Sequence, residues 1–168
     1  TYLGATTWLA PAGDLDGDGR SELLNPTYSN NGSDVGALVV FSSTEHLLQD
    51  LGSALAGGLG EPVLEVESAM TGGSVLRLRL SGAATVAAVH LIVGVAPLNA
   101  PFMGGTLVPA PNLVLGDFFT DGAGAFELWA PLPPVVPSGA ELYMQSWIAD
   151  GGAPAGFAAS NGVKGVFP

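Results

Sequence analysis

Apolar and polar residues alternate with a period of two along much of the chain after residue 60. In "SVLRLRLSG", three leucines alternate with Arg77 and Arg79, which predicts a strand with one buried face and one polar face. The segment "VLEVES" alternates in the same way, and pairing it with the arginine strand would place Glu65 and Glu67 near opposite charges. The two segments therefore predict neighbouring strands of one sheet.

Three further segments extend this β pattern. "ELYMQSWIAD" also alternates, and "AATVAAVHLIVGVAPL" is typical of a buried strand because it is rich in β-branched residues. "LGDFFTDGAGAFELWAPLP" predicts a hairpin around "TDGAG", since Asp-Gly tolerates the positive φ that a tight turn requires. Short strands about ten residues apart, separated by Gly and Pro, predict an antiparallel β-sandwich over residues 61–168.

Residues 1–60 predict a smaller N-terminal β region. "TYLGATTWLAP", "SELLNP" and "GALVVFSS" are expected to form three short strands around one acidic loop. "STEHLLQDLGSAL", residues 43–55, predicts one short connecting helix, with leucines at helical spacing and a Ser or Thr cap. The domain boundary is therefore placed near residue 60. Three such strands are hardly stable alone, so they should pack on something else.

The amino-acid composition restricts the range of possible functions. Charged residues make up 11% of the 168 residues, against ~25% in typical soluble domains. Two interpretations remain open: a secreted protein with a Ser/Thr/Gly/Asn surface, or a subunit whose surface is covered by its neighbours. A net charge of −11 argues against nucleic acid and anionic membranes as partners. The absence of cysteine excludes disulfides, zinc–thiolate sites and cysteine nucleophiles.

The sequence shows neither a signal peptide nor a convincing membrane span. The longest apolar stretch is shorter than the ~20 residues of a membrane span and has no flanking Lys or Arg, so no membrane insertion is expected. No signal peptide is visible before Thr1, and a processed mature chain and a trimmed chain both begin in this way. The expected location is extracellular or on the cell surface.

The stretch "GDLDGDGRSELL" concentrates four carboxylates within nine residues of an otherwise weakly charged chain. Read as a metal loop, its aspartates occupy alternate positions, Gly19 allows a sharp turn and Arg20 offers a backbone carbonyl. An all-oxygen donor set favours Ca²⁺ over Mg²⁺, which requires tighter octahedral geometry. An EF-hand is excluded because Asn25 stands where a bidentate Glu is required. The predicted metal ligands are Asp14, Asp16, Asp18, Arg20 and Glu22.

These residues carry a resemblance. "GDLDGDGRSELLNPTYSNNGSDVGALVVFSS", within residues 12–43, resembles one FG-GAP repeat, the integrin-type propeller blade with a calcium loop between strands. The resemblance implies the same ligands, Asp14, Asp16, Asp18, the Arg20 carbonyl and Glu22, and a structural Ca²⁺. It departs from the family in the number of repeats, because a propeller needs several blades and one repeat cannot close it.

The later part of the chain carries a second resemblance. "GGSVLRLRLSGA", "HLIVGVAPLNAPFMGGTLVPAPNLVL", "FTDGAGAFELWAPLP" and "SNGV" are similar to a β-rich module that ends large secreted bacterial proteins, notably of planctomycete type. That module often follows FG-GAP repeats. The similarity implies export and a sandwich fold, and no chemistry.

No sequence motif indicates catalysis. His46 is expected on an exposed helical surface, and His90 as a hydrogen-bonded structural residue within an apolar strand. Glu127 and Glu141 could in principle form a glycosidase pair, but strand carboxylates are usually the solvated face of a sheet. The tryptophans (Trp8, Trp129 and Trp147) could form a carbohydrate platform, although core or interface positions are commoner for tryptophan.

The sequence therefore predicts a non-enzymatic, exported, calcium-binding structural or adhesive protein. The sharper hypothesis is a self-associating subunit of an extracellular filament, in which "TYLGATTWLA" completes a neighbour's sheet by strand addition. An ordinary first strand within its own domain is the competing interpretation of that segment. The alternative functions are a C-terminal accessory or sorting domain of a larger secreted protein, and a carbohydrate-binding module.

Overall fold

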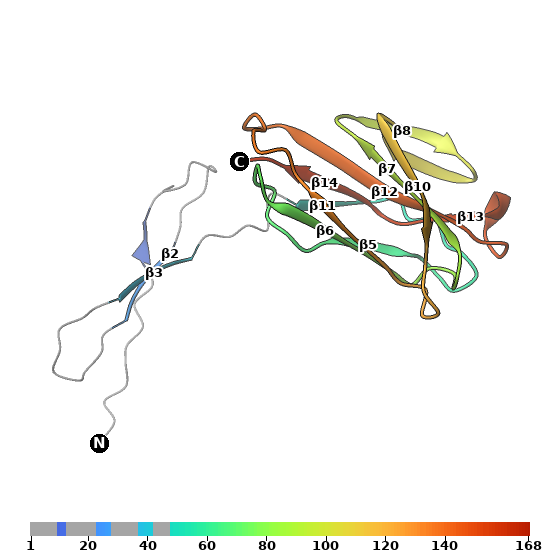
Figure 1. Cartoon of the computed structure of the whole chain (residues 1–168), viewed down its shortest axis with the longest axis horizontal. Coiled ribbons are helices and arrows are strands. Elements are labelled where there is room, and N and C mark those ends of the chain that lie inside the picture. The colour runs from blue at the N-terminus through green and yellow to red at the C-terminus, as the bar shows by residue number, and fades with distance from the viewer. Residues whose placement is uncertain (1–9, 13–22, 28–36, 42–47) are drawn as a thin grey trace, which may run out of the picture. The chain divides into compact units, whose positions relative to one another are not determined.

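A computed structural model describes residues 10–12, 23–27, 37–41 and 48–168 (Figure 1). The chain divides into two compact units, residues 1–44 and residues 45–168. In the first unit, three strands form an antiparallel sheet in the order β1–β2–β3. These strands are β1 (Ala10–Pro11), β2 (Leu23–Thr27) and β3 (Ala37–Phe41).

The second unit consists of two antiparallel sheets and a hairpin (Figure 1). The larger sheet has the order β10–β7–β12–β14–β4, and β13 also pairs with β12. Its strands are β4 (Leu48–Gly52), β7 (Ala88–Gly94), β10 (Leu113–Phe119), β12 (Glu141–Ala149), β13 (Phe157–Ala159) and β14 (Gly162–Val166). The smaller sheet has the order β11–β6–β5, with β5 (Val63–Val66), β6 (Val75–Ser81) and β11 (Phe126–Pro131). The hairpin is β8 (Pro97–Phe102) with β9 (Gly105–Pro109).

The main core lies between the two sheets, so the predicted all-β sandwich is confirmed. Leu76, Leu78 and Leu80 of β6 are buried on one face of the small sheet, as their alternation with arginines predicted. They belong to clusters that also contain residues of the large sheet, among them Leu91 and Met144. Each leucine so buried contributes on the order of 1.5–3 kcal/mol relative to an exposed one.

Strand β12 is buried on both faces, which its alternating sequence did not indicate. Met144 and Ile148 face the core between the sheets, whereas Trp147 packs on the opposite face of the large sheet. The β8–β9 hairpin contacts that outer face, because Val108 N–H donates to Gln145 Oε1 over 3.0 Å and Phe102 packs against Trp147. The large sheet is therefore covered on both sides along β12.

The helix predicted over residues 43–55 is wrong. Residues 48–52 form strand β4, which pairs with β14 at the edge of the large sheet, and residues 42–47, with His46, lie outside the described residues. Gly52 and Ser53 both have positive φ, at 63° and 65°, which no right-handed helix accommodates. A helix of this length is marginal on its own, so pairing with β14 determines the structure. Strand β4 precedes the boundary placed near residue 60, yet it pairs in the sheet of the second unit.

The hairpin predicted around "TDGAG" is wrong in its pairing, although its turn is confirmed. Asp121 Oδ1 accepts the N–H groups of Ala123 and Ala125, and Gly124 has a φ of 72°. The flanking strands, however, lie in different sheets: β10 pairs with β7, and β11 pairs with β6. The segment therefore crosses from one sheet to the other. A register shift after Leu115 allows Phe118 to join the aromatic contact with Phe126 between the sheets.

Candidate functional site

The two lateral sides of the sandwich differ in how they end. On one side, β4 of the large sheet lies near β5 of the small sheet, and we call this pair of strands the pinned edge. On the other side, β10 and β11 are the terminal strands, and Phe118 and Phe126 join them with ring centroids 5.0 Å apart. We call the side of β10 that faces away from β7 the open edge. Either side exposes the hydrogen-bonding groups of a terminal strand unless something covers them.

At the pinned edge, one side chain bonds to the main chain of β5. Asn161, which is buried between β13 and β14, accepts the Leu64 N–H at Oδ1 over 2.7 Å and donates from Nδ2 to the Leu64 carbonyl over 3.3 Å. The same Nδ2 lies 3.1 Å from Asp50 Oδ1 on β4. The amide thus takes the place of a neighbouring strand at Leu64 and links the two sheets.

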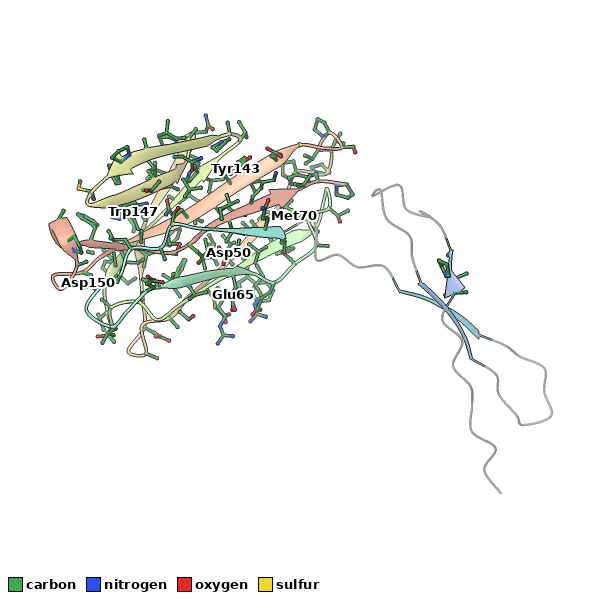
Figure 2. The ribbon with its side chains drawn as sticks, turned by 180° about the vertical axis from the view of Figure 1, so that it is seen from behind. Asp50, Glu65, Met70, Tyr143, Trp147 and Asp150 are labelled. Atoms are coloured by element: carbon green, nitrogen blue, oxygen red, sulfur yellow. The ribbon has the colours of Figure 1, made fainter. Side chains whose placement is uncertain are left out.

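The groove that remains along the pinned edge has a mixed lining. It holds about 430 Å³, and its lining combines leucines and valines with Asp50, Glu65 and Glu67. Figure 2 shows Asp50 and Glu65 on the strands that border it. An incoming strand would have to accept these negative charges as well as displace Asn161. Charged edges of this kind oppose strand pairing.

The open edge carries neither an amide nor a row of charges. Among the described residues, β10 has main-chain bonds only on its β7 side. Leu113, Val114 and Phe119 are 50%, 54% and 63% exposed, and Asp117, at a φ of 62°, is its one charged residue. An uncovered apolar terminal strand is a site for pairing with another chain.

An apolar pocket of about 310 Å³ adjoins the open edge on the outer face of the large sheet. Val114 of β10 lines it together with residues of β7, β12, β13 and the β8–β9 hairpin. The residues that line the pocket include His90, Phe102, Met103, Val114, Trp147 and Phe157. A pocket of this size and character is a typical binding site for an apolar group.

The floor of the pocket is held in place by hydrogen bonds. Trp147 is 2% exposed, its ring meets Phe102 edge to face at 4.9 Å, and its Nε1 donates to Gln145 Oε1 over 3.2 Å (Figure 2). Gln145 is fully buried, and its Nε2 donates to the carbonyls of Thr106 and Ser160. The hairpin is therefore tied to the sheet through one glutamine, which fixes the position of the indole.

Among the described residues, His90 is the only titratable one that lines the pocket. A Cβ at Gly116 of β10 would lie 3.3 Å from His90 Cδ2, so glycine lets the imidazole lie close against the terminal strand. The sequence predicted a hydrogen-bonded structural histidine at this position. Within the described part of the chain, the ring has no hydrogen-bond partner, and it borders the pocket instead.

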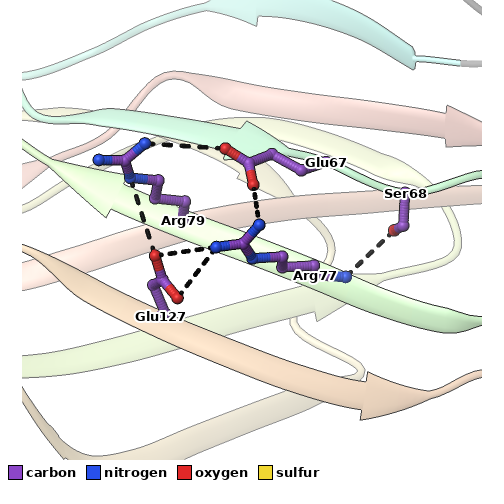
Figure 3. Close-up of polar contacts among 5 residues, drawn as sticks. All are labelled: Glu67, Ser68, Arg77, Arg79 and Glu127. Atoms are coloured by element: carbon purple, nitrogen blue, oxygen red, sulfur yellow. Dashed lines mark hydrogen bonds and ion pairs between the residues drawn. The ribbon is translucent and has the colours of Figure 1, made fainter.

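The polar face of the small sheet confirms the predicted strand pairing. Glu65 lies opposite Arg79 in the β5–β6 register, and Arg77 Nη1 lies 2.7 Å from Glu67 Oε2. Figure 3 shows that Glu127 of β11 completes the cluster, with its Oε1 3.2 Å from Arg77 Nη2. These groups are a third to a half exposed, so each pair contributes at most about 1 kcal/mol.

The structure does not bring the predicted glycosidase carboxylates together. Glu127 belongs to the small sheet and pairs with arginines, whereas Glu141 begins β12 of the large sheet. Glu141 Oε1 lies 2.6 Å from Lys164 Nζ, and its Oε2 accepts the Tyr143 hydroxyl over 2.7 Å. The hydrogen bond from Lys164, with that from Tyr143, lowers the pKa of Glu141, and the same contacts raise the pKa of Lys164 and of Tyr143.

The tryptophans form no common platform in the described residues. Trp129 is 61% exposed on the polar face of the small sheet, with the Arg77 guanidinium 4.8 Å from its ring centroid. Trp147 is buried on the outer face of the large sheet, on the far side of the sandwich. Trp8 lies outside the described residues.

The predicted calcium ligands, from Asp14 to Glu22, also lie outside the described residues. In the residues that are described, no three His, Cys, Asp or Glu side chains gather as a metal site would require. Nor does that part of the chain contain a helix of the length and hydropathy needed to cross a membrane.

Comparisons of the chain with protein-family models, curated proteins and solved structures find no match. The two resemblances noted in the sequence therefore stay predictions. What the described residues add is the contrast between the two edges and the pocket beside the open one, neither of which was predicted.

Proposed function

We propose that this chain is a non-enzymatic structural or adhesive module, exported from a bacterial cell, that associates with copies of itself by strand addition. The observation that supports the proposal is the open edge. Strand β10 is apolar and exposed, and within the described residues it has no main-chain partner on one side. At the pinned edge, an incoming strand would have to displace the Asn161 amide from Leu64. The open edge is therefore the better suited of the two to accept a strand.

The proposed donor is the N-terminal segment "TYLGATTWLA" of a second copy. It has no charged residue, which suits an apolar edge. Its last residue, Ala10, pairs with Leu24 in β1, and the nine residues before it exceed the seven of β10. Donor and acceptor lie at different places on the chain. Such head-to-tail contacts produce an open filament when the rotation between subunits does not close a ring.

Calcium has a structural role in this proposal. The alternating carboxylates from Asp14 to Glu22 follow the donor segment within a few residues, and their spacing suits an all-oxygen calcium loop. Ca²⁺ bound there would order the chain next to the donor. Chelation should then weaken association without acting on the open edge itself.

Light scattering of the full chain and of a variant lacking residues 1–9 tests the proposal, each with and without excess EGTA. We expect large particles for the full chain, smaller ones in EGTA, and monomers for the deletion variant under both conditions. A deletion variant that assembles as the full chain does would contradict strand addition. A full chain that is monomeric and loses only thermal stability in EGTA would instead indicate an accessory domain with calcium confined to folding.

One observation supports a second candidate, a carbohydrate-binding module. Trp129 is exposed beside Glu127 and Arg77, and an exposed indole flanked by polar groups suits a sugar ring. Binding to a glycan array that Trp129→Ala abolishes would favour this candidate. Retention of all glycan signals in that variant would count against it.

A further inference from the structure

The pocket beside the open edge has the chemistry of an aromatic-binding site. Phe102, Trp147 and Phe157 line it with rings, and Met103 contributes a flexible thioether at its mouth. Its volume of about 310 Å³ is at the lower end for ligand sites, where these run from about 300 to 1,000 Å³. The pocket therefore suits one ring system better than an extended ligand.

The described residues present no polar surface to an occupant of the pocket. His90 borders it, but a Cβ at Gly116 would lie 3.3 Å from the imidazole Cδ2 and 3.7 Å from Nε2, so this edge of the ring lies against β10. A polar group that enters the pocket therefore loses its hydrogen bonds to water without replacement, which costs free energy. A large ring with few polar atoms suits the pocket best, and an indole has a single N–H on a large apolar surface.

The pocket is continuous with the open edge. Val114 of β10 lines it, and Gly116, two residues further along the same face, lies against His90. A strand added along β10 would direct every second side chain towards this face of the sheet. An aromatic residue at one such position would enter the pocket without distortion of the pairing.

Resting on the proposed function, we infer that the pocket binds the indole of Trp8 from a second copy of the chain. In the donor segment, Tyr2 and Trp8 are six residues apart and so share one face of a strand. They are separated by roughly 20 Å along an extended strand, which is too far for both to enter one pocket. Trp8 is the occupant because its indole is the larger ring and brings one polar N–H, whereas the tyrosine hydroxyl is both a donor and an acceptor.

A double-mutant cycle in the full chain tests this inference. Trp8→Ala removes the indole, and Val114→Trp fills the pocket from its own rim. If the indole occupies the pocket, each change should weaken self-association by about tenfold or more, and the combined variant should lose no more than either alone. Association is measured by sedimentation equilibrium, and the unfolding midpoint of each variant reports on folding.

Matched variants separate the pocket from general effects. Leu113→Trp adds the same ring at the neighbouring, equally exposed position, and Tyr2→Ala removes the other aromatic of the donor; both should associate nearly as the native chain does. Should Val114→Trp fail to fold, Met103→Trp fills the mouth from the hairpin. Losses that multiply in the combined variant, or an equal loss from Leu113→Trp, would overturn the inference.

The inference and the proposed function can fail separately. If the chain lacking residues 1–9 is monomeric while Trp8→Ala assembles as the native chain does, strand addition stands and the pocket assignment is wrong. If the chain lacking residues 1–9 still assembles, strand addition by this segment is wrong, and the pocket assignment fails with it.

Discussion

The pinned edge and the open edge close the same sandwich with different chemistry. At the pinned edge, Asn161 bonds to the backbone of Leu64 and to Asp50, so the amide satisfies main-chain groups and joins the sheets. At the opposite side, the rings of Phe118 and Phe126 cover the core, and the structure describes no partner for the outer main-chain groups of β10. Excluding water from a core and pairing the main-chain groups of a terminal strand are separate requirements. Among the described residues, the open edge meets only the first.

The difference also concerns what each edge presents to another molecule. Carboxylates line the groove of the pinned edge, so a second chain would meet negative charge there. The open edge presents apolar side chains and an apolar pocket, with Asp117 as the one charge on its strand. For a chain of net charge −11, this strip with its single charge is where a second copy meets little repulsion.

Removing the amide of the pinned edge should have the largest effect. Asn161→Ala leaves the Leu64 N–H and carbonyl without partners in a buried setting, so we expect a loss of about 2–4 kcal/mol in the free energy of unfolding, measured by urea denaturation. The control is Asn112→Ala, which loses one exposed bond from the Val95 N–H and should cost about 1 kcal/mol or less. Equal losses in the two variants would mean that Asn161 does not close the edge.

A charge on the open edge should abolish association with little change in folding. Val114→Lys places a cation on β10, and lysines on terminal strands oppose pairing with another chain. We expect monomers by light scattering and a free energy of unfolding within about 0.5 kcal/mol of the native value. Val135→Lys is the matched control, since Val135 is 85% exposed on a loop between β11 and β12. If both variants remain assembled, the open edge is not the contact.

Lowering the pH should have the smallest effect on the unfolding midpoint, and it should act through carboxyls at two separate places in the sandwich. Glu141 and Asp121 have lowered pKa values, the first through Lys164 and Tyr143 and the second through the N–H groups of Ala125 and Ala123. A carboxyl whose folded pKa lies below its unfolded value, about 4 for these groups, stabilises the fold above that pH and loses the contribution as the pH falls through the folded pKa. Unfolding midpoints should therefore be flat from about pH 5 to 9 and fall below pH 4.

At alkaline pH, the unfolding midpoint should fall as the pH rises, opposite to its behaviour in acid. The raised pKa values of Tyr143 and Lys164 stabilise the fold below about pH 10 and lose that contribution as the pH rises through their folded values. Glu141→Gln should flatten both limbs, and Asp121→Asn only the acid one. If the unfolding midpoint falls in acid to the same extent in both variants as in the native chain, other carboxylates cause that fall.

The sequence predicted those parts of the fold in which neighbouring residues carry the information. The period of two in β6, its pairing with β5 and the Asp121–Gly124 turn are all local patterns, and all are confirmed. The errors arose where a distant partner decides. The spacing of leucines around Leu51 suits a helix, but β14, more than a hundred residues away, makes the segment a strand. The turn after β10 could equally join one sheet or cross between two.

The candidate site could not be predicted from the sequence, because it too depends on residues that are distant along the chain. Asn161 lies 97 residues from Leu64 and 111 from Asp50, and nothing in its surroundings marks it as an edge closure. The pocket gathers residues from six strands, so no single segment indicates it. His90 was noticed as a polar residue in an apolar strand, and that signal located one wall of the pocket without showing its purpose.

By itself the sequence determined the β character, the buried face of the central strands and the absence of cysteine chemistry, because these follow from residue types and local periodicity. Only the tertiary structure decided where a side chain bonds to an edge strand, at Leu64 of β5, and where the structure describes no such partner, along β10. Main-chain hydrogen bonds at a sheet edge carry no side-chain signature, so their satisfaction depends on which distant residue lies opposite. Here that residue is Asn161 on one side and, in this chain, none that the structure describes on the other.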